Sequence, residues 1–151
     1  MKKLLLSYEL TWRDEEDKKF LKSKDWRNIR LDILTRDNYT CNYCGFRSEK
    51  RMQVNHVNGD PKNHSNENLE VICGLCHMIL HSGLWCAVKK IIILFKNSKY
   101  TQNEIIGFTR KMRTDGKSDD DIIEFLGLTE KLEWKQDHEY LSQSFGFIRS
   151  F

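Results

Sequence analysis

Two cysteine pairs with the same spacing constrain this chain more than any other feature. Cys41 and Cys44 frame the segment CNYC, and Cys73 and Cys76 frame CGLC. Two residues between thiolates let a tight turn direct both sulfurs at one metal ion, and two such turns complete a tetrahedral four-cysteine site. The spacing therefore predicts a structural Zn²⁺ bound by these four cysteines. Cys86 is left unpaired, and we expect it to be a small core side chain.

The size and composition of the chain agree with a small protein that uses a metal for stability. It has 151 residues, of which 39% are hydrophobic and 31% charged, so a single large core is not expected. The apolar runs are too short to span a membrane or to serve as an export signal. We therefore expect a cytoplasmic protein with no membrane partner, in which reduced cysteines bind metal rather than form disulfides.

The segments around the cysteine pairs predict a short α+β core. Apolar residues recur at helical spacing in 25–37, at Trp26, Ile29, Ile33 and Leu34. Residues 52–57 and 69–73 are each typical of a short strand, and the turn-rich segment 58–68 between them holds the only proline. A helix over 75–83 should follow.

Four of the five histidines lie in or beside these elements. His77 and His81 are four residues apart on the expected helix and share a face. If zinc holds the start of that helix close to the first strand, His56 and His77 converge on one cavity. His64, in the turn-rich segment, is expected to be a solvated turn residue, and His138 is expected to be structural.

The order of these motifs resembles that of the zinc-ribbon HNH endonuclease family, which has the ββα-metal fold. The resemblance rests on WRNIRLDILTRDNYTCNYCG, VNHVNGD and NENLEVICGLCH, and it covers about residues 25–83. Several separate motifs in the family order are more specific than either cysteine pair alone. The resemblance implies a metal-dependent DNA endonuclease that hydrolyses phosphodiester bonds with a single catalytic divalent metal.

The resemblance also implies roles for the histidines and their neighbour. His56 corresponds to the general base, and a neutral imidazole with an ordinary pKa near 6.5 can take a proton from water at cellular pH. His77 corresponds to a ligand of the catalytic metal, and His81 stands where some members have a second histidine ligand. Asn55 stands where the family commonly has an Asp or His ligand. Its neutral amide is a weaker ligand for a hard cation than a carboxylate.

An asparagine completes the motif. Asn68 maps best to the middle Asn of the family, which braces the loop and orients the base, and Asn63 competes for this role. The mixed nitrogen and oxygen donors suit Mg²⁺, Mn²⁺, Ni²⁺ or Zn²⁺ as the catalytic metal, and the sequence does not choose among them.

The charge distribution is uneven and indicates DNA as a partner. Lys and Arg outnumber Asp and Glu by nine to five in residues 21–62 and by eight to two in 84–117, whereas 118–151 have three against eight. Basic stretches of this kind suit phosphate, although a solvated helix face is an equal alternative. The candidate phosphate contacts are Arg27, Arg30 and Arg36.

Beyond residue 84 the resemblance stops, and we expect an all-helical C-terminal extension. One helix is predicted over 84–99 and two more over 101–128. The expected caps are Thr101, Ser118 and Gly127. A small bundle packed on the core is favoured over a helix-turn-helix that contacts phosphate. The aromatic-rich end could dock on the core, or pair with a second copy or a partner protein.

The sequence thus predicts three parts: an N-terminal segment (1–24), an HNH nuclease core with a zinc ribbon (25–83) and the helical extension (84–151). Two alternatives to the nuclease remain open, a non-cleaving zinc-ribbon DNA-binding module and a zinc-stabilised protein-interaction adaptor. The sequence does not distinguish nicking from double-strand cleavage, and it does not choose among phage homing, defence and toxin roles.

Overall fold

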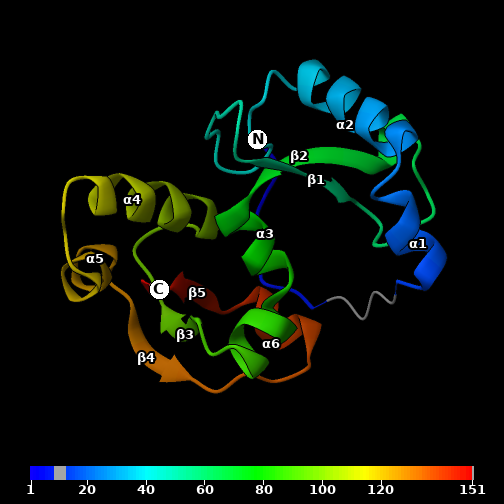
Figure 1. Cartoon of the computed structure of the whole chain (residues 1–151). Coiled ribbons are helices and arrows are strands. Elements are labelled where there is room, and N and C mark those ends of the chain that lie inside the picture. The colour runs from blue at the N-terminus through cyan, green and yellow to red at the C-terminus, as the bar shows by residue number, and fades with distance from the viewer. Residues whose placement is uncertain (9–12, 151) are drawn as a thin grey trace. The chain divides into compact units, whose positions relative to one another are not determined.

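The chain forms two compact units in its computed structural model, which describes residues 1–8 and 13–150 (Figure 1). One unit, here called the hairpin unit, comprises Leu10–Gly74. The other, called the sheet unit, comprises Met1–Glu9 together with Leu75–Phe151. Each unit is described by itself below.

Parts of two predicted segments lie outside the described residues. These are residues 9–12 of the N-terminal segment and Phe151 at the end of the C-terminal extension. The predicted division at residues 24 and 83 stays a prediction. No helix among the described residues has the length and apolar character needed to cross a membrane.

The hairpin unit is built on two antiparallel strands, β1 (Met52–His56) and β2 (Leu69–Cys73), as the sequence predicts. Met52 pairs with Cys73 at one end of the ladder, and His56 pairs with Leu69 at the other. The cysteine that ends β2 and the histidine that ends β1 therefore lie at opposite ends of the hairpin. A short 3₁₀ turn, η1 (Asn66–Asn68), leads into β2.

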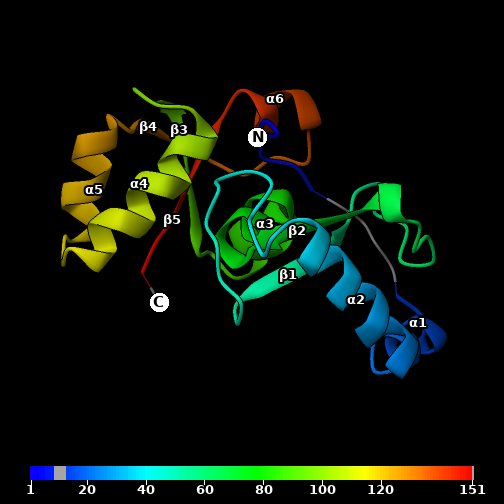
Figure 2. The same cartoon turned by 90° about the horizontal axis from the view of Figure 1, so that it is seen from above.

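Helix α2 (Lys24–Arg36) packs on both strands, and Figure 2 shows it beside them. The Ser23 side chain caps its start by accepting a hydrogen bond from the backbone N–H of Trp26. Trp26, Ile33 and Leu34 are buried, which confirms the helical face predicted from the spacing of the apolar residues. A shorter helix that the sequence analysis did not anticipate, α1 (Glu15–Phe20), precedes it.

The sheet unit contains a three-stranded antiparallel sheet of order β4-β3-β5, coloured from green to red in Figure 1. Its strands are β3 (Ile92–Asn97), β4 (Thr129–Leu132) and β5 (Phe145–Ile148). Its helical elements are α3 (Gly74–Leu80), the π-helical turn η2 (Gly83–Val88), α4 (Gln102–Thr114), α5 (Asp119–Leu126) and α6 (His138–Ser142). Gly74, the first residue of α3, is the last residue of the hairpin unit.

The prediction of an all-helical extension is therefore wrong. The segment expected to be one helix over 84–99 is the turn η2 followed by β3. The chain leaves η2 at Lys90, which has a positive φ of 56°. The run Ile91–Ile93 then favours a strand, because β-branched side chains fit an extended backbone better than a helix. The preceding helix, α3, also ends earlier than predicted, at Leu80 rather than near Gly83.

The two later helices are confirmed, with their caps. Thr101 and Glu104 form a capping box at the start of α4, and Ser118 caps α5. Gly127 ends α5 in the left-handed conformation, with φ of 66°. These helices pack on the sheet around the buried side chains Phe95, Ile105, Ile122, Leu126, Leu128 and Phe147. They are thus one layer on a sheet and not a separate bundle.

Both ends of the chain contribute to the sheet unit. Leu4 and Leu6 expose 1% and 2% of their surface, whereas Leu5 between them exposes 37%. The backbone N–H of Leu4 donates to Oδ1 of Asn103 on α4. At the other end, Phe147 of β5 is fully buried, so the aromatic-rich C-terminal segment docks on the core of its own unit.

Candidate functional site

The four cysteines of the two pairs lie together, as their spacing predicts. All four sulfur atoms are within 4.8 Å of one another, and the Sγ atoms of Cys44 and Cys73 are 3.6 Å apart. Sulfurs bound to one tetrahedral zinc at about 2.3 Å would be about 3.8 Å apart. The cluster could therefore hold a zinc ion, and three of its four cysteines are buried.

Local turn geometry directs the first pair inward. The backbone N–H of Cys41 donates to the carbonyl of Phe46, and that of Gly45 donates to the carbonyl of Cys41. Gly45 has φ of 78°, which a residue with a Cβ adopts only with strain. The backbone N–H of Tyr43 also points at Sγ of Cys41, at 3.5 Å. Such N–H contacts stabilise a thiolate, which is the form that binds metal.

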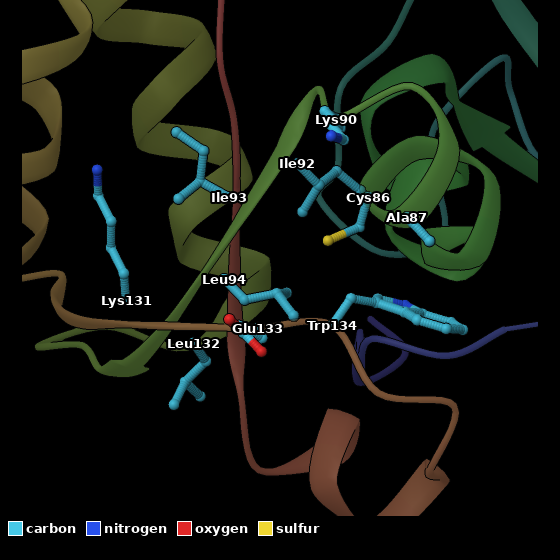
Figure 3. Close-up of a pocket in the computed structure, with 10 residues that line it drawn as sticks. All are labelled: Cys86, Ala87, Lys90, Ile92, Ile93, Leu94, Lys131, Leu132, Glu133 and Trp134. Atoms are coloured by element: carbon cyan, nitrogen blue, oxygen red, sulfur yellow. The ribbon is translucent and has the colours of Figure 1, made fainter.

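Cys86 stands apart from this cluster. It is half-buried in the sheet unit, and burial raises the pKa of its thiol to about 11. It lies beside a groove of about 480 Å³ whose other lining residues include Leu94, Lys131 and Trp134 (Figure 3). None of the predicted site residues lines this groove. The predicted pairing of the C-terminal extension with a second copy or a partner protein stays a prediction.

His56 ends β1 with a side chain that is only 4% exposed. Its ring stacks on Trp26 of α2, with 5.6 Å between centroids and 12° between planes. Burial, together with the positive charges of His64 and Arg13, lowers the pKa of His56 to about 4. The imidazole is therefore neutral at pH 7, as a proton acceptor must be.

His64 is not the solvated turn residue that the sequence suggests. Its ring stacks on Phe20 of α1 at 4.2 Å, and its Nδ1 lies 3.1 Å from Nε2 of His56. Burial lowers the pKa of His64 as well. Only the fold brings these two histidines together, and no motif spacing in the sequence could have indicated it.

Asn68, the last residue of η1, is buried immediately before β2 and joins three parts of the loop. Its Nδ2 donates to the carbonyl of Asn63, and its Oδ1 accepts from the backbone N–H of Asn58. The backbone carbonyl of Asn68 accepts from the backbone N–H of Val57. These contacts are those of a residue that braces the loop beside His56. The partner of the Asn63 side chain lies nearer in the sequence, since its Oδ1 accepts hydrogen bonds from the backbone N–H and the hydroxyl of Ser65.

Asn55 lies on the face of β1 opposite to His56, because successive side chains of a strand point to opposite faces. Its Nδ2 donates to Oε1 of Glu70 at 3.0 Å, and the hydroxyl of Tyr43 donates to the same oxygen at 2.7 Å. Glu70 exposes only 2% of its surface. This buried carboxylate is a functional candidate that sequence reasoning missed, although the register that pairs Asn55 with Glu70 indicates it.

His77 and His81 converge as their helical spacing predicts. Their Nε2 atoms are 2.9 Å apart and both side chains are half-buried. Two imidazole nitrogens that bind one ion at about 2.05 Å with tetrahedral angles are about 3.3 Å apart. The pair therefore has nearly the geometry that two ligands of one divalent cation need. The predicted convergence of His56 and His77 stays a prediction.

The three predicted phosphate contacts differ in how free their guanidinium groups are. Nη2 of Arg30 donates to the carbonyl of Met52. Arg36 donates to the carbonyls of Asn66 and Leu69. These two side chains thus join α2 to the hairpin, whereas Arg27 is exposed. Their predicted DNA contacts remain untested by this geometry.

Taken together, the described residues define an α+β protein with two small sheets and a four-cysteine cluster that could hold a metal ion. No family model matches the chain. It is similar to the Zorya protein ZorE of Escherichia coli (strain ATCC 8739 / Crooks), with 32% identity over 76 residues. The match covers 47% of this chain but only 21% of that protein. The chain therefore spans about a fifth of the length of this curated relative.

Proposed function

We propose that this chain is a metal-dependent DNA endonuclease of the HNH type. The observation that carries the proposal is the setting of His56, whose ring is buried at the end of β1 between Trp26 and His64. A neutral imidazole held in one orientation is what a general base for water requires. The four-cysteine cluster, at the other end of the hairpin, would provide the metal that stabilises this small unit.

The proposed reaction is hydrolysis of a phosphodiester bond. His56 takes a proton from water, the water oxygen forms a bond to phosphorus, and the bond to the 3′ oxygen of the sugar breaks. Asn68 holds the loop that follows the base, through its contacts with Asn58 and Asn63. Exposed Arg27 and the basic stretches along the chain would meet the phosphate backbone.

His77 and His81 would hold the catalytic divalent metal, because their Nε2 atoms converge at 2.9 Å. When bound, such an ion supplies positive charge to the scissile phosphate and to the leaving oxygen. Imidazole donors suit Ni²⁺ and Zn²⁺, whereas Mg²⁺ and Mn²⁺ prefer oxygen donors. The predicted role of Asn55 as a further ligand stays a prediction.

A second candidate function is a zinc-stabilised DNA-binding module that does not cleave. The hydrogen bond between Asn55 and Glu70 favours it, because the amide already has a buried partner on its own hairpin. This candidate predicts DNA binding without any product. The remaining alternative, an adaptor that binds only protein, predicts neither DNA binding nor cleavage.

Incubation of the purified protein with supercoiled plasmid and Mg²⁺ or Mn²⁺ tests the proposal. Nicked or linear product is expected from the parent. We expect His56→Ala to keep its zinc content and lose cleavage by about 10²–10⁴-fold, the usual contribution of a general base. His138→Ala is the matched control, since His138 is an exposed histidine stacked on Tyr8 of the sheet unit.

The histidine variants separate the base from the metal ligands. His77→Ala should also lose cleavage, and excess Mn²⁺ or Ni²⁺ should restore part of it, whereas extra metal cannot replace the proton acceptor at His56. Cleavage by His56→Ala at the parental rate would show that another residue is the base. A parent that shifts the plasmid but cuts nothing with any of these metals would favour the non-cleaving module.

A further inference from the structure

His64 is a neighbour of the proposed base to which the sequence motifs assign no role. Its Nδ1 lies 3.1 Å from Nε2 of His56, within hydrogen-bond distance. We propose that His64 is a positioning residue: it accepts a hydrogen bond from Nε2–H of His56 and so leaves Nδ1 of His56 as the nitrogen that takes the proton from water. The inference rests on the proposed function of His56.

The fold holds His64 firmly in this place. Its ring stacks on Phe20, with 17° between planes, and lies tilted against Trp26 at 5.6 Å. The loop that carries it is tied to the N-terminal end of α1, because Nζ of Lys62 lies 2.7 Å from a carboxylate oxygen of Asp17. Trp26 contacts both histidine rings, so one indole sets the relative position of the pair.

The direction of the hydrogen bond decides whether His56 can act as a base. A neutral imidazole carries one N–H and one nitrogen with a free lone pair. If His64 donated the bond, the proton of neutral His56 would sit on Nδ1, and neither nitrogen could then take a proton from water. If His64 accepts the bond, Nδ1 of His56 keeps its lone pair and can take the proton.

The accepted bond also suits the step that follows proton transfer. The imidazolium formed at His56 has N–H groups at both nitrogens, and Nε2–H continues to donate to the neutral ring of His64. A base whose second nitrogen has a fixed partner keeps one tautomer and one orientation through the reaction. Phe20 and Trp26 contribute by holding the two rings in contact.

Two variants separate the hydrogen bond from the stacking. His64→Asn keeps an acceptor at the place of Nδ1, because Oδ1 of Asn is likewise one bond beyond Cγ, but it loses the ring. His64→Phe keeps a ring to stack on Phe20 and loses the acceptor. We expect His64→Phe to lower kcat for plasmid cleavage at least ~10-fold with little change in KM, and His64→Asn to retain clearly more of the rate.

The opposite ranking, with Phe active and Asn inactive, would mean that His64 serves only as packing and would overturn the proposal. Faster cleavage by both variants would also overturn it, since it would mean that His64 blocks Nε2 of the base.

A readout without cleavage keeps this test separate from the proposed function. Nitrogen NMR of the histidine rings at pH 7, in the zinc-loaded parent, should show His56 with its proton on Nε2, and His64→Phe should lose that single tautomer. A proton on Nδ1 of His56 in the parent would overturn the inference. If the parent cut no DNA while His56 showed the expected tautomer, the proposed nuclease would fail and the positioning contact would stand.

Discussion

Truncation of Leu6 to alanine should destabilise the sheet unit although this residue lies far from the unit's other elements in the sequence. Leu6 is 2% exposed, and its Cδ2 lies 3.0 Å from the position that a Cβ on Gly146 would occupy. Ile79 and Ile92 approach the same position, at 3.1 and 3.2 Å. Leu6 is thus packed between α3 and the sheet.

The expected loss follows from the atoms removed. Leu→Ala deletes three carbon groups, worth about 0.8 kcal/mol each in transfer from water. The cavity left in a rigid core raises the cost, so the total should be about 3 kcal/mol, within the range of roughly 2.7–5 kcal/mol for buried leucines. For a unit of this size, about 3 kcal/mol lowers the midpoint of thermal unfolding by roughly 12–24 °C.

Leu5→Ala is the matched control, because Leu5 is 37% exposed and its truncation leaves no closed cavity. Its cost should be about 1 kcal/mol or less. Hydrogen exchange followed by mass spectrometry measures the effect locally: peptides from β3 and β5 should lose protection in Leu6→Ala, whereas those from β1 and β2 should keep it. Equal losses in the two variants, or a loss confined to the hairpin unit, would refute the reasoning.

Two further predictions concern the hairpin unit. Replacement of Cys41 by Ser should remove about one zinc per chain and unfold the hairpin, because a metal site of this kind contributes folding energy outright. Metal analysis and circular dichroism measure the two effects. Cys86→Ser is the control and should leave the zinc content unchanged, since Cys86 lies outside the cluster. The second prediction follows from the pKa of His56, which is about 4 in the folded protein against an ordinary 6.5. Between these pH values the unfolded chain binds more protons, so the free energy of unfolding should fall as the pH decreases from 6.5 towards 4, by up to ~3 kcal/mol. The charges that face His56 are those of His64, Arg13, Asp60 and Asp17, and His56→Gln should flatten the slope in denaturant titrations between pH 5 and 7; an unchanged slope would mean that another group causes it.

The sequence predicts best where the relevant interactions are local. Thr101, Ser118 and Gly127 mark helix ends because each acts on backbone groups within a few residues of itself. The C-x2-C pairs indicate a common cluster because the spacing alone brings two sulfurs to one side of a turn. His77 and His81 converge for the same reason, since four residues make about one helical turn.

The sequence misleads where a pattern fits two structures. The apolar residues between 84 and 99 match a helical face, but the same stretch contains three consecutive isoleucines, which favour a strand. The partners that decide between the two, β4 and β5, lie more than thirty residues further along the chain. A strand is stable only when such partners pair with it, and their pairing depends on the fold of the whole unit.

The sequence by itself therefore determined the two strands of the hairpin, most helices and the four cysteines of the cluster. Only the tertiary structure decided that Leu4 and Leu6 complete the core of the sheet unit, and that His64 contacts His56. The physical reason is the same in both cases. A side chain in a loop or at a terminus has no periodic pattern of its own, so its burial and its partners are fixed by packing against residues distant in sequence, such as Asn103 or Phe20.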